Sequence, residues 1–233
     1  MLEPQAREHR RVLSLWQLIE RAEPAMPRVR AWIGAAKNAV ELLPQSPGAG
    51  DRTLVALQIT TRSPMGAIAH ETGGLLVDHG WIRILGAHGP RSARDLATWN
   101  GLLPPDAQPR VSGALLIGDD AVGGFFALDG GAFGGSRHDV HYLAPDTLEW
   151  EPMEIGYSAW LRWAFDGDLD GFYGAQRWSG WKTDVAALSA NDAFSFFPPL
   201  WMKPDGGRRD RRGVPVDQLW DVALDFRRQL GLV

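Results

Sequence analysis

The middle of the chain constrains the fold most, because four short apolar or alternating runs follow one another there, separated by glycine, aspartate and proline. The runs cover residues 114–120, 122–135, 138–145 and 146–153. Runs of this length, bounded by such turn residues, are typical of strands joined by hairpins. The sequence therefore predicts a β-meander at the centre of the chain.

Helical patterns lie on both sides of this meander. Before it, Ser63 and Pro64 form a typical helix start, because the serine hydroxyl can cap free backbone N–H groups and proline fits the first helical position. After it, apolar residues recur at helical spacing in 158–165 and 217–231, each capped by its first residue. Helices that flank a run of strands, rather than alternating with single strands, predict an α+β fold with a central antiparallel or mixed sheet.

The length of the chain, 233 residues, suits one large domain. A chain of this size buries about 70% of its unfolded surface, so its core needs no metal or disulfide. We predict a single α+β domain over residues 1–233, with 1–13 as a loose polar lead and 178–233 as a C-terminal helical extension packed on the same core. In that extension, the proline-broken run 194–204 is expected to pack irregularly, and the arginine-rich run 205–213 to form an exposed loop.

Composition excludes several classes of function. The chain has no cysteine, which rules out disulfide frameworks, thiolate zinc sites, iron–sulfur clusters and a cysteine nucleophile. Its net charge of −4 argues against a general nucleic-acid binder. No segment has the roughly 18 consecutive apolar residues that span a bilayer, and the first residues lack the apolar core of a secretory signal. We therefore expect a cytoplasmic protein without nucleic-acid or membrane partners.

No motif of covalent or nucleotide chemistry is complete. The segment 156–160, GYSAW, lacks the second glycine of a hydrolase nucleophile turn, and Ser179 and Lys182 lack the companion motifs of penicillin-recognising enzymes. His138 and His141 are three apart on an expected strand, where they point to opposite faces. No GxxxxGK loop is present and no GxGxxG follows a strand. The sequence thus assigns no catalytic residue and no cofactor, and it favours a protein that is not an enzyme.

The segment DGDLDG is the best metal-like motif. Asp166, Asp168 and Asp170 stand at alternate positions before Gly171, as at the start of an EF-hand calcium loop. The position where that loop needs a bidentate glutamate is occupied by Arg177. This cation favours the alternative interpretation, in which the aspartates end one helix and cap the next.

Five residues are candidates for contact with a partner. Asp119, Asp120 and Asp129 flank an apolar strand, where they would form an acidic rim for a basic protein; ordinary hairpin corners are the alternative. Trp178 and Trp181 lie three apart on an expected helix. Exposed rings there would contact a protein or a sugar, whereas buried rings would belong to the core, and the sequence leaves both open.

Four blocks of the sequence resemble an uncharacterised bacterial family, domain of unknown function 2625. The blocks are 63–86, 118–135, 140–150 and 157–181, and the similarity extends over residues 15–230. More loosely, the glycine-flanked hairpin and the capped helix after it are similar to the SUKH superfamily. The matching positions are Gly73-Gly74, Gly123-Gly124, Val140 to Leu143, Trp150 and Ser158 to Phe165.

The resemblance implies an α+β fold and, for the SUKH-like pattern, a role as an immunity protein that binds and blocks a polymorphic toxin, frequently a nuclease. Other members of that superfamily are regulators that act through protein contacts, and no catalytic residue is carried over. The tryptophan-rich segment and the helix after Trp178 depart from the pattern, so the same binding face is not assumed.

The leading hypothesis is therefore a non-enzymatic domain that acts by protein–protein contact, neutralising a basic nuclease-type toxin. Two alternatives stay open. One is a small-ligand or carbohydrate binder that uses exposed Trp178, Trp181 or Trp201, and the other is a calcium-dependent or hydrolytic enzyme that uses the aspartates of 166–170. A homodimer that buries surface tryptophans is also compatible with the sequence.

Overall fold

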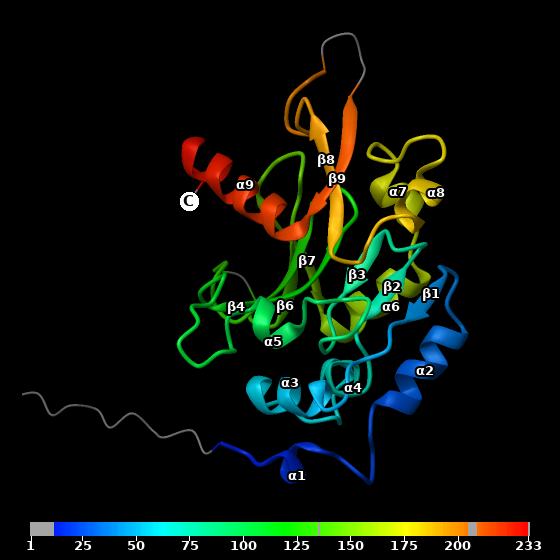
Figure 1. Cartoon of the computed structure of the whole chain (residues 1–233), viewed down its shortest axis with the longest axis vertical. Helices are drawn as coiled ribbons and strands as arrows, with labels where there is room; N and C mark the ends of the chain where they lie inside the picture. The colour runs from blue at the N-terminus through cyan, green and yellow to red at the C-terminus, as the bar shows by residue number, and fades with distance from the viewer. Residues whose placement is uncertain (1–11, 135, 205–208, 233) are drawn as a thin grey trace, which may run out of the picture.

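A seven-stranded antiparallel sheet forms the centre of the computed structural model, which describes residues 12–134, 136–204 and 209–232 (Figure 1). Each strand pairs with the next one along the chain, so the predicted meander and the α+β fold are confirmed. The strands are β1 (Val40–Leu42), β2 (Leu75–Val77), β3 (Ile82–Ile84), β4 (Ala114–Asp120), β5 (Phe125–Asp129), β6 (Asp139–Leu143) and β7 (Trp150–Gly156).

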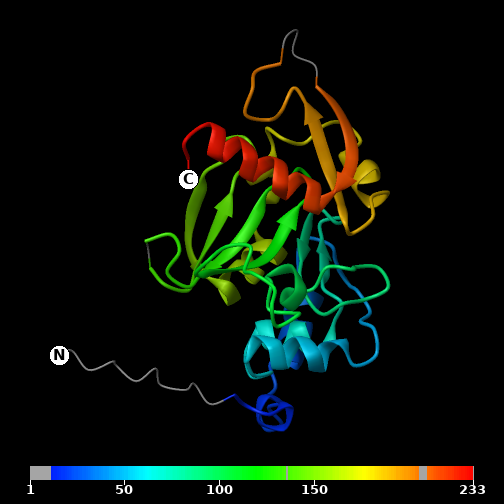
Figure 2. The ribbon, with the colours of Figure 1, turned by 60° about the vertical axis from the view of Figure 1, so that its left-hand side comes forward.

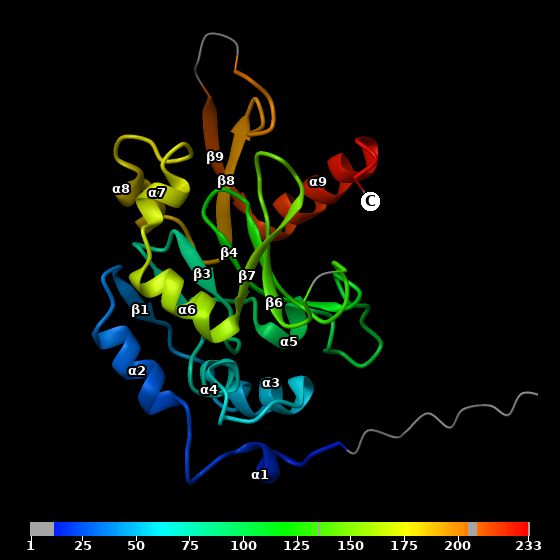
Figure 3. The ribbon, with the colours of Figure 1, turned by 180° about the vertical axis from the view of Figure 1, so that it is seen from behind.

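Helices cover both faces and one end of this sheet. In Figure 2 and Figure 3, α9 lies across one face, α6 lies on the opposite face, and α1 to α4 gather at one end of the molecule. None of the described helices is long and apolar enough to cross a membrane. The helices are α1 (Leu15–Leu18), α2 (Met26–Gly34), α3 (Ala49–Leu57), α4 (Pro64–Glu71), α5 (Leu96–Trp99), α6 (Tyr157–Asp166), α7 (Leu169–Tyr173), α8 (Trp181–Ala186) and α9 (Val216–Gln229).

The two faces of the sheet are filled by neighbouring residues of β5, because successive side chains of a strand point to opposite sides. Phe125 meets Trp220 of α9 edge-on, with ring centroids 4.8 Å apart. Phe126 packs on Trp160 of α6, with centroids 5.1 Å apart. All four side chains are almost completely buried, so β5 is the middle of a three-layer core.

Local capping decides where several helices begin. The Ser63 hydroxyl accepts a hydrogen bond from the Gly66 N–H at 3.0 Å, so the predicted start of α4 is confirmed. Asp168 caps α7 in the same way, through the Gly171 N–H at 2.8 Å. The predicted cap at Ser158 is wrong, because α6 begins one residue earlier with Gly156 as its N-cap.

The C-terminal segment contains strands as well as helices, which corrects the predicted helical extension, for which we expected no strand. Strands β8 (Asp192–Phe197) and β9 (Asp210–Pro215) pair antiparallel in a second sheet. Phenylalanines alternate with smaller residues in β8, and the prolines at 198 and 199 follow the strand instead of breaking it. The predicted irregular run and exposed loop are therefore wrong for these residues. Residues 205–208 of that loop, and 1–11 of the predicted polar lead, lie outside the described residues.

The C-terminal segment shares its core with the main sheet. Phe194, Val216 and Trp220 belong to the same buried hydrophobic cluster as the residues of β2 to β6. Because α9 is attached mainly through this cluster, its aromatic residue should contribute strongly to stability.

We predict that Trp220→Ala lowers the free energy of unfolding by about 3–5 kcal/mol, since it removes a large buried ring and leaves a cavity against Phe125. Urea denaturation monitored by circular dichroism measures this change in the free energy of unfolding. Val222→Ala is the control, because Val222 lies on the same helix and is 38% exposed. An equal loss in both variants would contradict this account of the core.

Candidate binding surface

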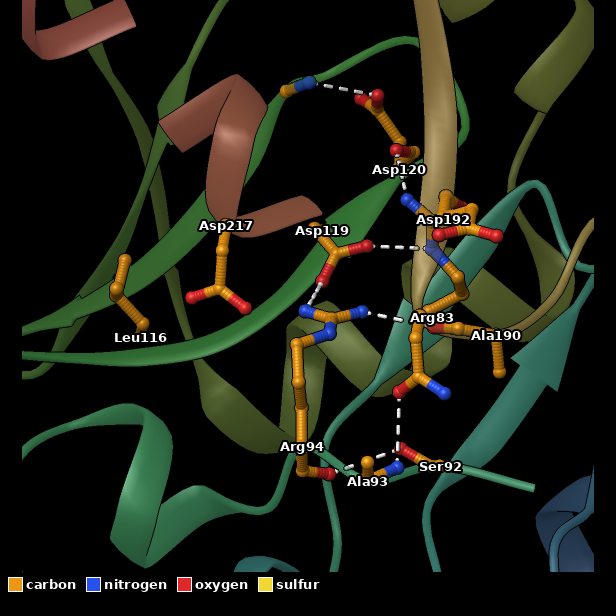
Figure 4. A network of polar contacts seen from close by, with 12 residues as sticks. Arg83, Ser92, Ala93, Arg94, Leu116, Asp119, Asp120, Ala190, Asp192 and Asp217 are labelled. Atoms are coloured by element: carbon orange, nitrogen blue, oxygen red, sulfur yellow. Dashed lines mark hydrogen bonds and ion pairs between the residues drawn. The ribbon is translucent and has the colours of Figure 1, made fainter. Parts of the chain in front are cut away.

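Asp119, predicted on an acidic rim, is instead buried at the centre of an ion cluster (Figure 4). Its Oδ1 accepts a hydrogen bond from Nε of Arg83 at 2.5 Å, and its Oδ2 accepts one from Nη1 of Arg94. Both guanidinium groups are almost completely buried as well. Asp119 is therefore the shared counter-ion of two buried cations, and it is not exposed to a partner.

The two arginines also donate to backbone carbonyls. Arg83 donates to the carbonyl oxygens of Asp120 and Asp192, and Arg94 donates to that of Ala190 at 3.0 Å. Burial lowers the pKa of Arg83, while the nearby carboxylate of Asp119 opposes this shift. The cluster thus fastens the segment that leads into β8 to strands β3 and β4.

Asp120 points to the opposite face of the sheet and is also buried. It accepts hydrogen bonds from the Tyr142 hydroxyl at 2.6 Å and from the N–H groups of Val122 and Gly124 at 3.0 and 2.8 Å. Burial raises the pKa of Asp120, and these donors act against the rise. Its carboxylate therefore organises the β4–β5 turn.

Asp129 caps the loop after β5. Its Oδ1 accepts hydrogen bonds from the N–H groups of residues 131–133 at 2.8, 2.7 and 3.3 Å. With a side chain this buried, Asp129 does not join Asp119 and Asp120 in an exposed rim, and the predicted acidic rim is wrong. The sequence shows polar residues beside an apolar strand, but it does not show the arginines and N–H groups that cover them.

Trp178 and Trp181 belong to an aromatic cluster. Trp181 is buried, with its ring 4.9 Å from that of Trp81 and 4.0 Å from the guanidinium of Arg177. Trp178 is half-buried, and its Nε1–H donates to Asp184 at 2.6 Å. Of the two interpretations that the sequence left open, the structure favours packing, and neither ring forms an open stacking platform.

The aspartates of the DGDLDG segment turn to different partners. Asp166 accepts a hydrogen bond from Nε of Arg162 at 3.0 Å, Asp168 caps α7, and Asp170 pairs with Arg177. Among the described residues, no group of three histidine, aspartate or glutamate side chains could hold a metal ion. The helix-ending and capping roles account for the motif in this geometry.

An exposed aromatic ring, Phe172 of α7, packs on residues whose neighbours carry exposed carboxylates. The ring is 44% exposed and contacts Tyr142 and Trp163, with centroids 5.5 and 5.0 Å away. Tyr142 is the cross-strand neighbour of Glu151 on β7.

Two further carboxylates are linked to the segment that carries Phe172. Asp168 lies one helical turn before Phe172 and forms no ion pair with a described residue. Asp146 accepts a hydrogen bond at 3.5 Å from Gln176, which stands four residues after Phe172. We call Phe172, Asp146, Glu151 and Asp168 the acidic face.

The acidic face carries charge that the fold does not neutralise. In the described part of the chain, no ion pair reaches Asp146, Glu151 or Asp168, and all three residues are exposed. Beyond Asp168 the surface carries both negative and positive charges, because a hollow of about 290 Å³ there is also lined by Lys37 and Lys182. The sequence offered one signal that we missed, namely that acids recur along 146–154 on a strand at the edge of the sheet.

Comparisons with known proteins agree on a single family. Residues 15–219 match the family described as protein of unknown function DUF2625. The chain is 43% identical over 213 residues to the putative uncharacterized protein YbfG of Escherichia coli (strain K12), covering 91% of this chain and 95% of that protein. It is 35% identical over 187 residues to an uncharacterized protein of Haemophilus influenzae, covering 80% and 82% of the two chains. No solved structure gives a significant match.

We predict that Asp119→Ala lowers the free energy of unfolding by about 3–5 kcal/mol, because it leaves two buried guanidinium groups without their counter-ion. Asp106→Ala, on an exposed loop, should change it by less than about 0.5 kcal/mol. Chemical denaturation of both variants measures the difference, and similar values for the two would refute the role of the ion cluster.

We predict that Asp184 makes stability depend on pH in the acid range. The Trp178 N–H and the Arg211 guanidinium hold the pKa of Asp184 below its ordinary value of 3.8. The folded state then binds fewer protons than the unfolded state, so this stabilisation is full above pH 3.8 and disappears as the pH falls through the folded-state pKa. Asp184→Asn removes it, so the stability difference between wild type and variant should shrink from pH 5 to pH 2. A difference that is constant over this range would rule out the effect.

Proposed function

Because the chain belongs to the DUF2625 family of proteins of unknown function, we propose a function from its surface: it binds another protein on the acidic face. The partner that we propose is a basic protein of the nuclease-toxin type, so that binding neutralises the toxin. The choice of a protein partner and of this surface is supported by the described side chains. The choice of a toxin is supported by the SUKH-like pattern of glycines and capped helix in the sequence.

One observation carries the proposal: a partly exposed phenylalanine lies on segments that carry exposed carboxylates, and these carboxylates form no ion pair within the described chain. Aromatic side chains at the centre of an interface supply much of its binding energy, and a polar rim around them excludes water. Phe172 already rests on Tyr142 and Trp163, so its ring is fixed before a partner arrives. Less side-chain freedom is then lost on binding.

The charge of the face indicates the chemistry of the partner. Nucleases hold a polyanion, so their active sites are lined with lysine and arginine. Carboxylates at Asp146, Glu151 and Asp168 would attract such a surface over a distance and orient it on arrival. The same carboxylates would occupy the cationic groups that otherwise hold nucleic acid.

The carbohydrate alternative needs three exposed tryptophan rings, and the packing of these rings gives it little support. Trp178 and Trp181 lie in the aromatic cluster, and the ring of Trp201 packs on Phe226 of α9 with centroids 4.9 Å apart. We therefore do not propose sugar binding.

The proposed function is tested by calorimetric titration with a panel of basic nuclease-toxin domains. Wild-type protein should bind its cognate toxin with a dissociation constant below about 1 μM and inhibit its nuclease activity. Asp146→Lys/Glu151→Lys should weaken binding at least tenfold, and more at low salt, because it reverses two charges of the face. Phe172→Ala should weaken binding at least tenfold at any salt concentration.

The matched control is Asp106→Lys/Asp221→Lys, which reverses two exposed carboxylates elsewhere that also lack ion pairs in the described chain. It should bind like wild type. If the control and the Asp146→Lys/Glu151→Lys variant lose equal affinity, the acidic face is not the binding site. If no toxin domain binds with micromolar affinity, the toxin class is wrong.

A further inference from the structure

The hollow of about 290 Å³ beside Asp168 lies where the segment before β1, the turn after β2 and the start of α7 meet. Most of the residues that line it are polar or charged. Its lysine, arginine and aspartate residues are Lys37, Arg177, Lys182, Asp78, Asp168 and Asp170. The proposed function uses none of the three cations, so a ligand held by them would be a separate property of the protein.

Arg177 is fixed in the wall of this hollow. Its side chain is 6% exposed, and its guanidinium lies over the rings of Trp81 and Trp181, 4.8 and 4.0 Å from their centroids. Its Nη2 donates to the buried carboxylate of Asp78 at 2.5 Å. Two aromatic faces and a buried carboxylate therefore hold this cation in place, whatever happens to its remaining partner.

The remaining partner of Arg177 lies on the open side. Asp170 accepts a hydrogen bond from Nη1 of Arg177, although the Asp170 side chain is 83% exposed. Because this carboxylate is open to solvent, the place that it occupies beside Nη1 is reached from outside. Ion pairs of exposed side chains contribute little to stability, so Asp170 can turn into solvent at low cost and leave Nη1 facing the hollow.

Two further cations lie at the same hollow without a counter-ion. Lys37 and Lys182 are exposed and form no ion pair with a described residue. Nζ of Lys182 is 5.5 Å from the centroid of the Trp181 ring, which also contacts the guanidinium of Arg177. When Asp170 turns away, three cations line the hollow beside two carboxylates, so the hollow then favours an anion.

We propose that this hollow binds the phosphate group of a phosphate monoester, and that Asp170 occupies the place of the phosphate in the free protein. A phosphate monoester has three acceptor oxygens, so it can contact Arg177, Lys37 and Lys182 together. Asp170 forms an ion pair with Arg177 alone among the described residues, so the phosphate gains contacts that Asp170 lacks.

The size of the hollow restricts what can carry the phosphate. Its volume is close to the lower end of the range of about 300–1,000 Å³ for small-molecule sites, which fits one phosphate group on a short stem. A small free ester and a phosphorylated side chain of a peptide share this chemistry, and the experiment distinguishes them.

The test is an NMR titration of ¹⁵N-labelled protein with glycerol 3-phosphate at pH 8 and constant ionic strength, with acetate as the monoanion control. The amide signals of Asn38 and Gly167, which line the hollow, should shift and saturate with glycerol 3-phosphate. Acetate should bind at least tenfold more weakly. Acetyl-Gly-phosphoserine-Gly-amide is titrated in the same way, and tighter binding of this peptide assigns the site to a phosphorylated side chain, whereas weaker binding assigns it to a free ester.

Asp170→Asn is the decisive variant, because the proposal predicts that it strengthens binding. It removes the charge that competes with the phosphate, and Arg177 keeps its ion pair with Asp78, so the fold is retained. Its affinity for glycerol 3-phosphate should rise at least threefold. Asp166→Asn makes the same charge change four residues earlier, at a side chain that pairs with Arg162 and does not line the hollow. It should change the affinity by less than a factor of two.

The lysines are tested by Lys37→Gln/Lys182→Gln, which should weaken glycerol 3-phosphate binding at least tenfold. Both side chains are exposed, so the variant should unfold at the same temperature as wild type. The matched control is Arg52→Gln/Lys203→Gln, which removes two exposed cations that do not line the hollow and form no ion pair in the described chain. It should bind glycerol 3-phosphate like wild type.

An affinity of Asp170→Asn that equals or falls below that of wild type would overturn the proposal. Equal losses in the lysine variant and its control would overturn it as well, and so would wild-type protein that shows no saturable shift with the ester or the peptide. Lys37→Gln/Lys182→Gln leaves every residue of the acidic face in place, so it should bind toxin at least as tightly as wild type, and the two proposals fail separately.

Discussion

The ion cluster of Asp119, Arg83 and Arg94 is the interaction on which the rest of the fold depends. Two guanidinium groups stay buried because one carboxylate lies between them and backbone carbonyls accept several of their other donors. Those carbonyls belong to the segment that enters β8, so the cluster fixes where the C-terminal part of the chain meets the main sheet. From there β8 pairs with β9, and α9 closes the face of the sheet over Phe125.

The carboxylates of this protein fall into groups that differ in the hydrogen-bond donors and cations they meet from other parts of the chain. Asp119 and Asp120 are saturated by guanidinium, hydroxyl or N–H donors, and they stabilise the fold. Asp146 and Glu151 meet no cation of the described chain and keep their charge at the surface beside Phe172. Asp129 lies between these cases, because one oxygen is saturated and the other is not. The proposed function rests on this division, because only the carboxylates at the surface can meet a partner.

Elements with a strong local signal could be predicted from the sequence. The meander follows from turn residues between short apolar runs, and the starts of α4 and α7 follow from side chains that cap the N–H groups two or three residues ahead. The candidate site could not be predicted in this way. Asp119 has its cationic partners 36 and 25 residues away, and no local pattern connects them. Strand β8 was missed because the prolines after it suggested irregular structure, and its partner β9 comes only after a further connection.

The sequence by itself determined the fold class, the central meander of strands and the absence of cysteine chemistry, because each of these depends on residue types and on neighbours within a few positions. Only the tertiary structure decided which aspartates and tryptophans are covered and which are open. Burial and ion pairing depend on side chains that come together from distant segments, as Arg83, Arg94 and residues 190–192 do around Asp119. The exposed charge around Phe172 is therefore a property of the assembled sheet and α7, and residue spacing alone does not contain it.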